Sequence, residues 1–219
     1  MPDLLNYGGM NKILRSLILS DLFILGSFGL IQPIFALFIT REISGATIKA
    51  VGIAVTIQLV VKAVFQIIVG KWADEEDGNR RELMALIAGS ALQSLIPLGY
   101  LFLHNLSEIY ILQVIYGVGL ALAYPGWMVV FSRYLRTDKA GYEWGVYNTT
   151  ISLGTAVAAG LGAYLADVYG FSVLFIIVSI FSFIGTGFIV HIFIHEFVHT
   201  GSSKRSPEHY HHLAKRHKR

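Results

Sequence analysis

The chain has 219 residues, of which 54% are hydrophobic and 14% are charged, and its mean hydropathy is +0.60. These values lie outside the range of ordinary soluble domains and indicate a membrane protein. The sequence contains no Cys, which excludes disulfides, thiolate metal sites and cysteine nucleophiles.

Six apolar runs are each long enough to cross about 30 Å of hydrocarbon as a helix. They are 17–39, 50–70, 83–103, 109–131, 146–168 and 171–194. The predicted fold class is therefore an all-α membrane protein with six transmembrane helices. Residues 1–16 form an N-terminal segment, 17–195 the transmembrane domain, and 196–219 a basic, His-rich tail.

Lys and Arg residues are distributed unevenly over the predicted loops. Fourteen of them fall on the side that carries both termini and two on the other side, while Lys62 lies inside a predicted helix. The positive-inside rule then places both termini in the cytoplasm of a multi-pass protein in the cell membrane. The net charge of +3 comes largely from the tail, so membrane lipid is the expected partner and nucleic acid is not.

Polar residues interrupt the first two predicted helices. Asp21 and Gln32 share roughly one face, and Gln58, Lys62 and Gln66 form a stripe at four-residue spacing. An ionisable group in mid-membrane costs about 3 kcal/mol, so each needs a partner or an aqueous cavity. Asp21 and Lys62 lie at similar depths, and we expect them to form an ion pair. Two interpretations of these polar residues are open. They line a substrate or proton pathway, or they only form hydrogen bonds between helices.

A short loop, 70–81, packs seven charged side chains between the second and third apolar runs. Its pattern resembles the loop signature that follows the second helix in the major facilitator superfamily of secondary transporters, and it consists of Gly70, Ala73, Asp74, Gly78, Arg80 and Arg81. The resemblance implies that Asp74, Arg80 and Arg81 help to latch the cytoplasmic side. The alternative is a solvated loop that only obeys charge topology.

The third, fourth and fifth predicted helices differ in character. The run 83–103 has few polar interruptions and is interpreted as a mostly lipid-facing support. The next two runs contribute further candidates for the pathway, namely Gln113, Tyr116, Tyr124 and Asn148. Small residues at four-residue spacing in the fifth run predict a close helix–helix seam, which a partner molecule's helix could use; they are Gly154, Ala158 and Gly162. This seam resembles the fifth-helix motif of the family's antiporters.

Gly70 to Asp74 at the end of the second run recurs with one extra residue as Gly162 to Asp167 at the end of the fifth. Since the two groups of three helices start on opposite sides, the pattern predicts an inverted 3+3 repeat. This is the unit of one half of the family's usual twelve-helix fold. A second copy of the chain, or another six-helix half, is therefore the expected protein partner.

The resemblance implies a secondary active transporter of a small solute that works by alternating access as a homodimer, with protons as a candidate coupling ion. It implies neither an enzyme nor a cofactor. Two alternatives stay open. His195-Glu196-x-x-His199, with His191 one turn earlier, matches a zinc metalloprotease pattern. The second alternative is a membrane assembly subunit that does not transport a solute.

Overall fold

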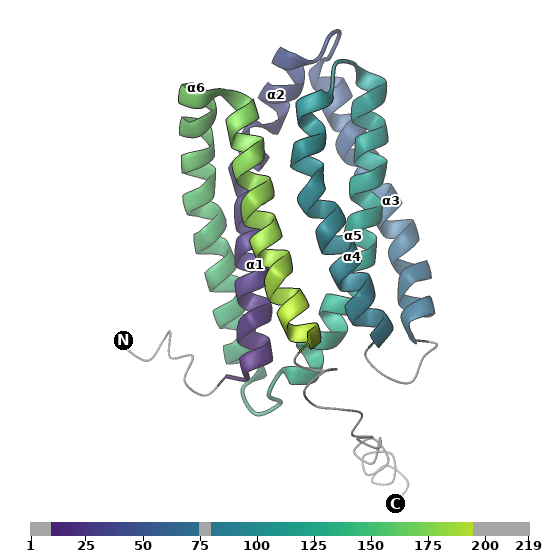
Figure 1. The fold of residues 1–219 in the computed structure, drawn as a ribbon, viewed down its shortest axis with the longest axis vertical. Coiled ribbons are helices and arrows are strands. Elements are labelled where there is room, and N and C mark those ends of the chain that lie inside the picture. Colours follow the sequence, from purple (N-terminus) through teal and green to yellow (C-terminus); the bar gives the residue numbers. More distant parts are fainter. Residues whose placement is uncertain (1–9, 75–79, 195–219) are drawn as a thin grey trace, which may run out of the picture.

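The computed structural model describes residues 10–74 and 80–194, and these are helical almost throughout. Figure 1 shows the elements, which are α1 (Lys12–Ile31), η3 (Gln32–Ile34), α2 (Phe35–Glu42), α3 (Ile48–Asp74), α4 (Arg80–Gly99), η4 (Tyr100–Phe102), α5 (Leu106–Tyr134) and α6 (Ala140–Ile194). Asn11 caps α1 by accepting a hydrogen bond from the main-chain nitrogen of Ile13. Residues 75–79 are not among those described, so Gly78 of the predicted loop lies outside the structure's described residues.

The long helix α6 is two helices that meet at Gly170, where the chain reverses direction (Figure 1). Gly170 has φ 81° and ψ 168°, a conformation that residues with a Cβ avoid. Five helical stretches among the described residues are long and apolar enough to cross a membrane, and the 55-residue α6 supplies two crossings. The six predicted transmembrane helices are therefore confirmed. We call 140–169 the first half and 171–194 the second half of α6.

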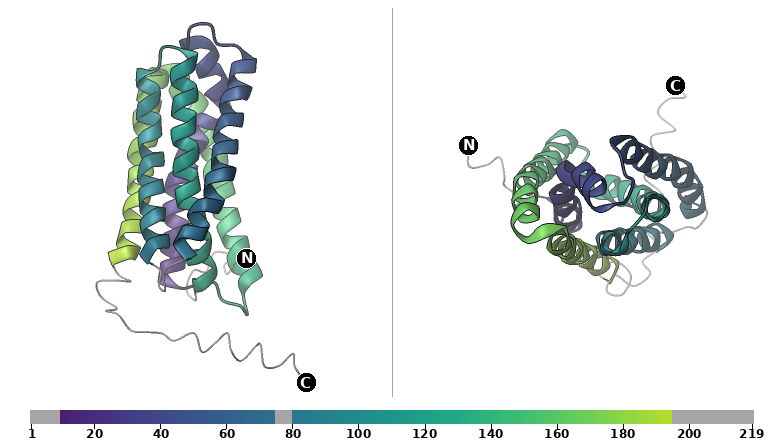
Figure 2. Two further views of the ribbon diagram at one scale, coloured as in Figure 1. Left: turned by 90° about the vertical axis from the view of Figure 1, so that its right-hand side faces the viewer. Right: turned by 90° about the horizontal axis from the view of Figure 1, so that it is seen from above.

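Viewed from above, the helices form two sides of a bundle (Figure 2). On one side α3 and the first half of α6 flank α1 and α5, whereas α4 and the second half of α6 lie on the other side. Along its length α1 packs on α6, and α3 packs on α5. The start of α1 and the end of α6 lie together (Figure 1), and we call this the terminal end of the bundle.

Small residues allow α1 and the first half of α6 to approach closely. A Cβ atom placed on Gly162 would collide with the main-chain oxygen of Leu30, and one on Gly154 would collide with the side chain of Leu22. From the opposite helix, a Cβ on Gly29 would lie 3.2 Å from the Cβ of Ala158. The seam is thus filled by α1 of the same chain, and the suggestion that a partner's helix uses it is wrong.

The expectation that 83–103 is a lipid-facing support is also wrong. Half of the apolar window of this helix is buried, against 11% for α3. Its buried hydroxyls face the second half of α6, where the Ser94 hydroxyl donates to Ser182 Oγ at 2.9 Å and lies 3.0 Å from Thr186 Oγ1. Ser179 in turn donates to the carbonyl oxygen of Ser94. A helix with few polar residues can therefore still be buried, when those residues lie on one face and contact another helix.

Replacing Ser94 by Ala should lower the stability of the bundle by about 1 kcal/mol, because hydrogen bonds between membrane helices average about 0.6 kcal/mol each. The control is Ser90→Ala, since Ser90 is similarly buried and its carbonyl oxygen, 2.9 Å from Ser94 Oγ, is unchanged by the substitution. Thermal unfolding in detergent compares the two. If the two variants melt together below the wild type, the hydroxyl network is not the cause.

Candidate functional site

Asp21 lies inside the bundle on α1, with 9% of its surface exposed. Its carboxylate accepts a hydrogen bond of 2.9 Å from the Tyr147 hydroxyl, which comes from the first half of α6. The Tyr147 ring belongs to a cluster with Trp127 and Phe131 of α5 and with Trp144 of α6, at centroid distances of 5.1, 5.3 and 5.8 Å. These rings fix the hydroxyl over the carboxylate, so that within residues 10–74 and 80–194 Asp21 has a polar partner but no cation.

Lys62 makes its contact elsewhere. Its ammonium nitrogen lies 4.6 Å from the ring centroid of Tyr124 on α5. The expected ion pair between Asp21 and Lys62 is therefore not formed, and that prediction is wrong. The physical reason is the order of the helices: α1 packs on α6 while α3 packs on α5. A tyrosine from each of these neighbours occupies the place that the opposite charge was expected to take.

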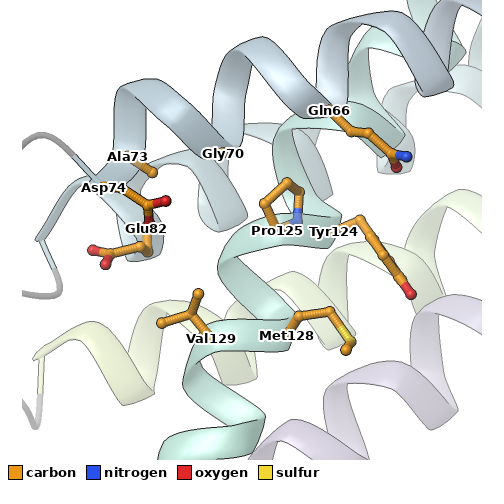
Figure 3. Close-up of a pocket in the computed structure, with 9 residues that line it drawn as sticks. All are labelled: Gln66, Gly70, Ala73, Asp74, Glu82, Tyr124, Pro125, Met128 and Val129. Carbon is orange, nitrogen blue, oxygen red and sulfur yellow. The ribbon is translucent and has the colours of Figure 1, made fainter.

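A groove of about 340 Å³ lies between α3 and α5 toward the terminal end of the bundle (Figure 3). The two helices diverge along it. A Cβ on Gly117 would lie 2.7 Å from the carbonyl oxygen of Gln58, whereas one on Gly70 would lie 3.9 Å from Pro125. The lining includes two of the predicted pathway residues, Gln66 and Tyr124, and two residues of the predicted gating loop, Gly70 and Asp74; Ala73, Glu82, Pro125, Met128 and Val129 complete it.

The groove is polar at its ends and apolar between them. Gln66 and Tyr124 lie at one end, and the carboxylates of Asp74 and Glu82 lie at the other (Figure 3). Glu82 is only 6% exposed, and its Oε2 is buried without a hydrogen-bond partner in the part of the chain that the structure describes. The shape and polarity suit a small elongated molecule with an apolar body, since ligand sites typically combine apolar walls with a few placed polar groups.

The gating-loop residues next to the groove are partly engaged. Arg81 donates a hydrogen bond of 3.2 Å from Nη1 to the carbonyl oxygen of Trp72, and its guanidinium lies 5.4 Å from that ring. Arg80 is the first residue of α4 and directly follows residues 75–79, which lie outside the described chain. Asp74 ends α3 with an exposed side chain. These residues gather at the terminal end of α3 and α4, beside the groove.

The other predicted pathway residues lie away from the groove. Gln113 is 1% exposed and donates from Nε2 to the Tyr100 hydroxyl at 3.1 Å. Tyr116 stacks on Phe28 with a centroid distance of 5.3 Å. Both pairs are contacts between helices, although Gln113 Oε1 is buried without a hydrogen-bond partner among the described residues.

Two further candidates are exposed. Gln32 follows the last residue of α1 in the turn η3, and its side chain is exposed. Asn148 donates from Nδ2 to the carbonyl oxygen of Trp144, one turn earlier on its own helix, at 3.0 Å. The structure therefore places Gln66, Tyr124 and Asp74 along one groove and Lys62 beside the Tyr124 ring, but it leaves Gln32 and Asn148 outside this group.

Sequence reasoning missed Tyr147 and Glu82. Tyr147 is separated from Asp21 by 126 residues, and nothing local marks it as the carboxylate's partner. An available signal was its spacing from Trp144, which puts two aromatic rings on one helical face. Glu82 directly follows the charged loop 70–81 and belongs to no recognised motif, although it is the acidic residue in the first turn of α4.

The metal candidates fall at the edge of the described chain. His191 lies in the last turn of α6, whereas His195, Glu196 and His199 lie outside the described residues. Within 10–74 and 80–194, no group of three His, Asp or Glu side chains is placed to hold a metal ion. The sequence motif consequently gains no support from the geometry that surrounds His191.

Comparison with known proteins identifies related transporters. The chain is 26% identical over 176 residues to the multi-drug resistance efflux pump PmrA homolog of Lactococcus lactis subsp. lactis, covering 80% of this chain and 42% of that protein. It is 24% identical over 160 residues to the multi-drug resistance efflux pump PmrA of Streptococcus pneumoniae serotype 4, covering 72% and 39%. The chain thus spans about two fifths of the length of these relatives.

A solved structure shows the same fold. The crystal structure of the POT family transporter PepTSo matches with a TM-score of 0.64 and 19% identity over 82% of this chain and 37% of that one. The family model described as the Major Facilitator Superfamily matches residues 17–217. By this match, which covers nearly all of the described helices, the chain belongs to the Major Facilitator Superfamily.

Proposed function

We propose that this chain is one six-helix half of a secondary active transporter that moves a small organic solute by alternating access. The observation that carries the proposal is the pair of ionisable groups inside the bundle, Asp21 and Lys62, which contact tyrosines rather than each other. Charges in membrane helices are expensive and usually mark substrate or proton pathways. The efflux pumps to which the chain is similar support export of the solute.

Asp21 is the candidate for proton coupling. Among the described residues its carboxylate has a single hydrogen-bond donor, Tyr147, which comes from a different helix. Protonation of Asp21 would remove a charge from the bundle and change this contact between α1 and the first half of α6. Because a movement of these two helices would alter the same contact, binding of a proton and a conformational change can be linked there.

A complete pathway needs a second bundle, which we propose is another copy of the chain. Large apolar residues form an exposed stripe at three- and four-residue spacing on the first half of α6, at Leu153, Val157, Leu161, Tyr164 and Val168. The side chains of α3 are mostly exposed as well. Two copies related by a two-fold axis along the membrane normal would bring α3 of each against the first half of α6 of the other.

The same arrangement suggests a role for the charged loop. Asp74 ends α3 at the terminal end, where α6 begins. In the two-fold pair it would face the N-terminus of α6 in the second copy, and a carboxylate there gains about 0.3 to 1 kcal/mol from the helix dipole. So modest a contact can break when the bundles rock apart. We propose that the terminal end lies in the cytoplasm of a cell membrane, as the loop charges indicate.

Transport in proteoliposomes tests the proposal. Purified protein is reconstituted, an inward or outward proton gradient is imposed, and the accumulation of small aromatic probes of negative, neutral and positive charge is followed. We expect gradient-driven accumulation of at least one probe, abolished by a protonophore. If no probe moves above protein-free vesicles although the protein is folded and dimeric, the alternative of a non-transporting assembly subunit is favoured.

A further inference from the structure

Lys62 lacks an acidic partner among the residues that the structure describes. Its ammonium group instead lies over the Tyr124 ring, 4.6 Å from the centroid. A cation–π contact contributes about 0.5 to 2 kcal/mol, whereas a Lys near the centre of a membrane helix costs about 3 kcal/mol. The ring therefore offsets only part of the free-energy cost of placing the Lys62 charge in the membrane. A bound anion would offset the rest.

The neighbouring side chains on α3 add donors to this position. Gln58 and Gln66 lie one turn on either side of Lys62, and all three are partly buried. No hydrogen bond within the described chain engages either glutamine side chain. Each amide group offers two N–H donors, and the ammonium offers three and no acceptor. A group that only accepts hydrogen bonds, such as a carboxylate, is the chemical complement of this row.

The depth of Lys62 decides between two sources of such a group. It lies twelve residues from the end of α3 at Asp74 and fourteen from its start at Ile48. At about 1.5 Å per residue this places it roughly 18 Å from the nearer end of the helix. The phosphates of lipid headgroups lie at the membrane surface, beyond the ends of a hydrocarbon core of about 30 Å. An anion at Lys62 must therefore belong to a molecule that enters the bundle.

We propose that Lys62 and Gln66 bind the carboxylate of a small organic acid, whose apolar body lies along the groove between α3 and α5. This inference rests on the proposed transport function and names the class of its substrate. Gln66 and Tyr124 line the near end of the groove, and Pro125, Met128 and Val129 of α5 provide its apolar wall (Figure 3). The Tyr124 ring, 46% exposed, offers a flat surface to an aromatic acid.

Equilibrium binding to the purified full-length chain in neutral detergent tests this assignment without requiring transport. The probes are 1-naphthoate and 1-naphthamide, which have the same ring and differ in the charge of one group. Binding is followed by the fluorescence anisotropy of the naphthyl group. The wild type should bind naphthoate at least tenfold more tightly than naphthamide.

The variants assign the preference to one side chain. Lys62→Met should reduce the ratio of the two affinities to about one, whereas Lys62→Arg should keep it because the charge remains. Lys49→Met is the matched control, since Lys49 is an exposed residue at the other end of α3, and it should leave the ratio unchanged. Equal binding of both probes by the wild type, or a ratio that survives Lys62→Met, overturns the proposal.

A lipid arm separates the two sources of an oxyanion. The same titration is repeated in nanodiscs of phosphatidylcholine alone and with phosphatidylglycerol added. The proposal expects equal naphthoate affinity in both. If phosphatidylglycerol displaces naphthoate from the wild type but does not change naphthamide binding, Lys62 binds a headgroup and the proposal is wrong.

The binding and flux measurements can contradict the carboxylate site and the transport function independently of each other. Charge-selective binding that depends on Lys62, without gradient-driven flux, would support the carboxylate site and contradict transport. Flux of 1-naphthylmethylamine in proteoliposomes, with no preference for naphthoate in either assay, would support transport and overturn the carboxylate site.

Discussion

Replacing Gly162 by Ala should destabilise the bundle by about 2 to 3 kcal/mol, because overpacking of a close contact costs about 1 to 3 kcal/mol. The added methyl would collide with the main-chain oxygen of Leu30, and main chain cannot rotate aside as a side chain can. For a domain of this size the loss corresponds to a melting temperature lower by about 5 to 10 °C. Thermal unfolding in detergent, followed by size-exclusion chromatography, measures it.

Gly160 provides the matched control on the same helix. A Cβ placed there meets nothing within 4 Å, so Gly160→Ala should be neutral or stabilising, as alanine favours helix over glycine by up to about 1 kcal/mol. The close approach of α1 and α6 is refuted if Gly162→Ala melts at or above the temperature of Gly160→Ala.

Asp21→Asn should lower gradient-driven flux at least tenfold while the protein stays folded. The amide keeps the size of the side chain and can still accept the hydrogen bond from Tyr147, but it cannot gain or lose a proton. Tyr147→Phe should have a smaller effect, because the carboxylate remains and only its donor is lost. Flux in proteoliposomes at matched protein content, with melting temperature as the check on folding, compares the variants.

Asp167 serves as the control for charge removal, since it is an exposed carboxylate on the first half of α6. Asp167→Asn should transport like the wild type. Undiminished, proton-driven flux in Asp21→Asn would exclude Asp21 as the coupling group, whereas an equal loss in both variants would point to a general effect of charge on the protein.

Much of the fold could be predicted because a membrane helix corresponds to one continuous apolar stretch of sequence. The six apolar runs correspond to the six helical crossings of the structure, and a backbone spanning a membrane must satisfy its hydrogen bonds internally. Gly170, which separates the fifth and sixth runs, is where the chain turns with a positive φ. The membership of the major facilitator superfamily followed from a short loop pattern around Asp74 and is confirmed by the family match.

Helix neighbours could not be predicted in the same way. Periodicity and depth indicated that Asp21 and Lys62 avoid lipid, but they do not say which helix each one faces. The structure gives each a tyrosine instead, Tyr147 for the acid and Tyr124 for the base. Pairings across 126 residues of sequence depend on the packing order of the bundle, and a single sequence does not contain that order.

The same limit explains the error on the third predicted helix. The small number of serines in this helix suggested that it faces lipid. The hydroxyl of Ser94 nevertheless contacts those of Ser182 and Thr186 in the second half of α6. The glycine seam was recognised from its spacing, but its occupant, α1, was not. In each case the residue type predicted the kind of contact but not the helix that makes it.

Disulfide crosslinking tests the central claim, that two copies place α3 of each against the first half of α6 of the other. The chain has no Cys, so introduced cysteines report without background. Leu59 and Val157 are 55% and 64% exposed and lie at matching depths on α3 and α6. Leu59→Cys/Val157→Cys, oxidised in membranes, should form a covalent dimer, while each single variant and Leu59→Cys/Ile180→Cys should stay monomeric. A monomer from the first pair, or a dimer from the Ile180 pair alone, would contradict the account.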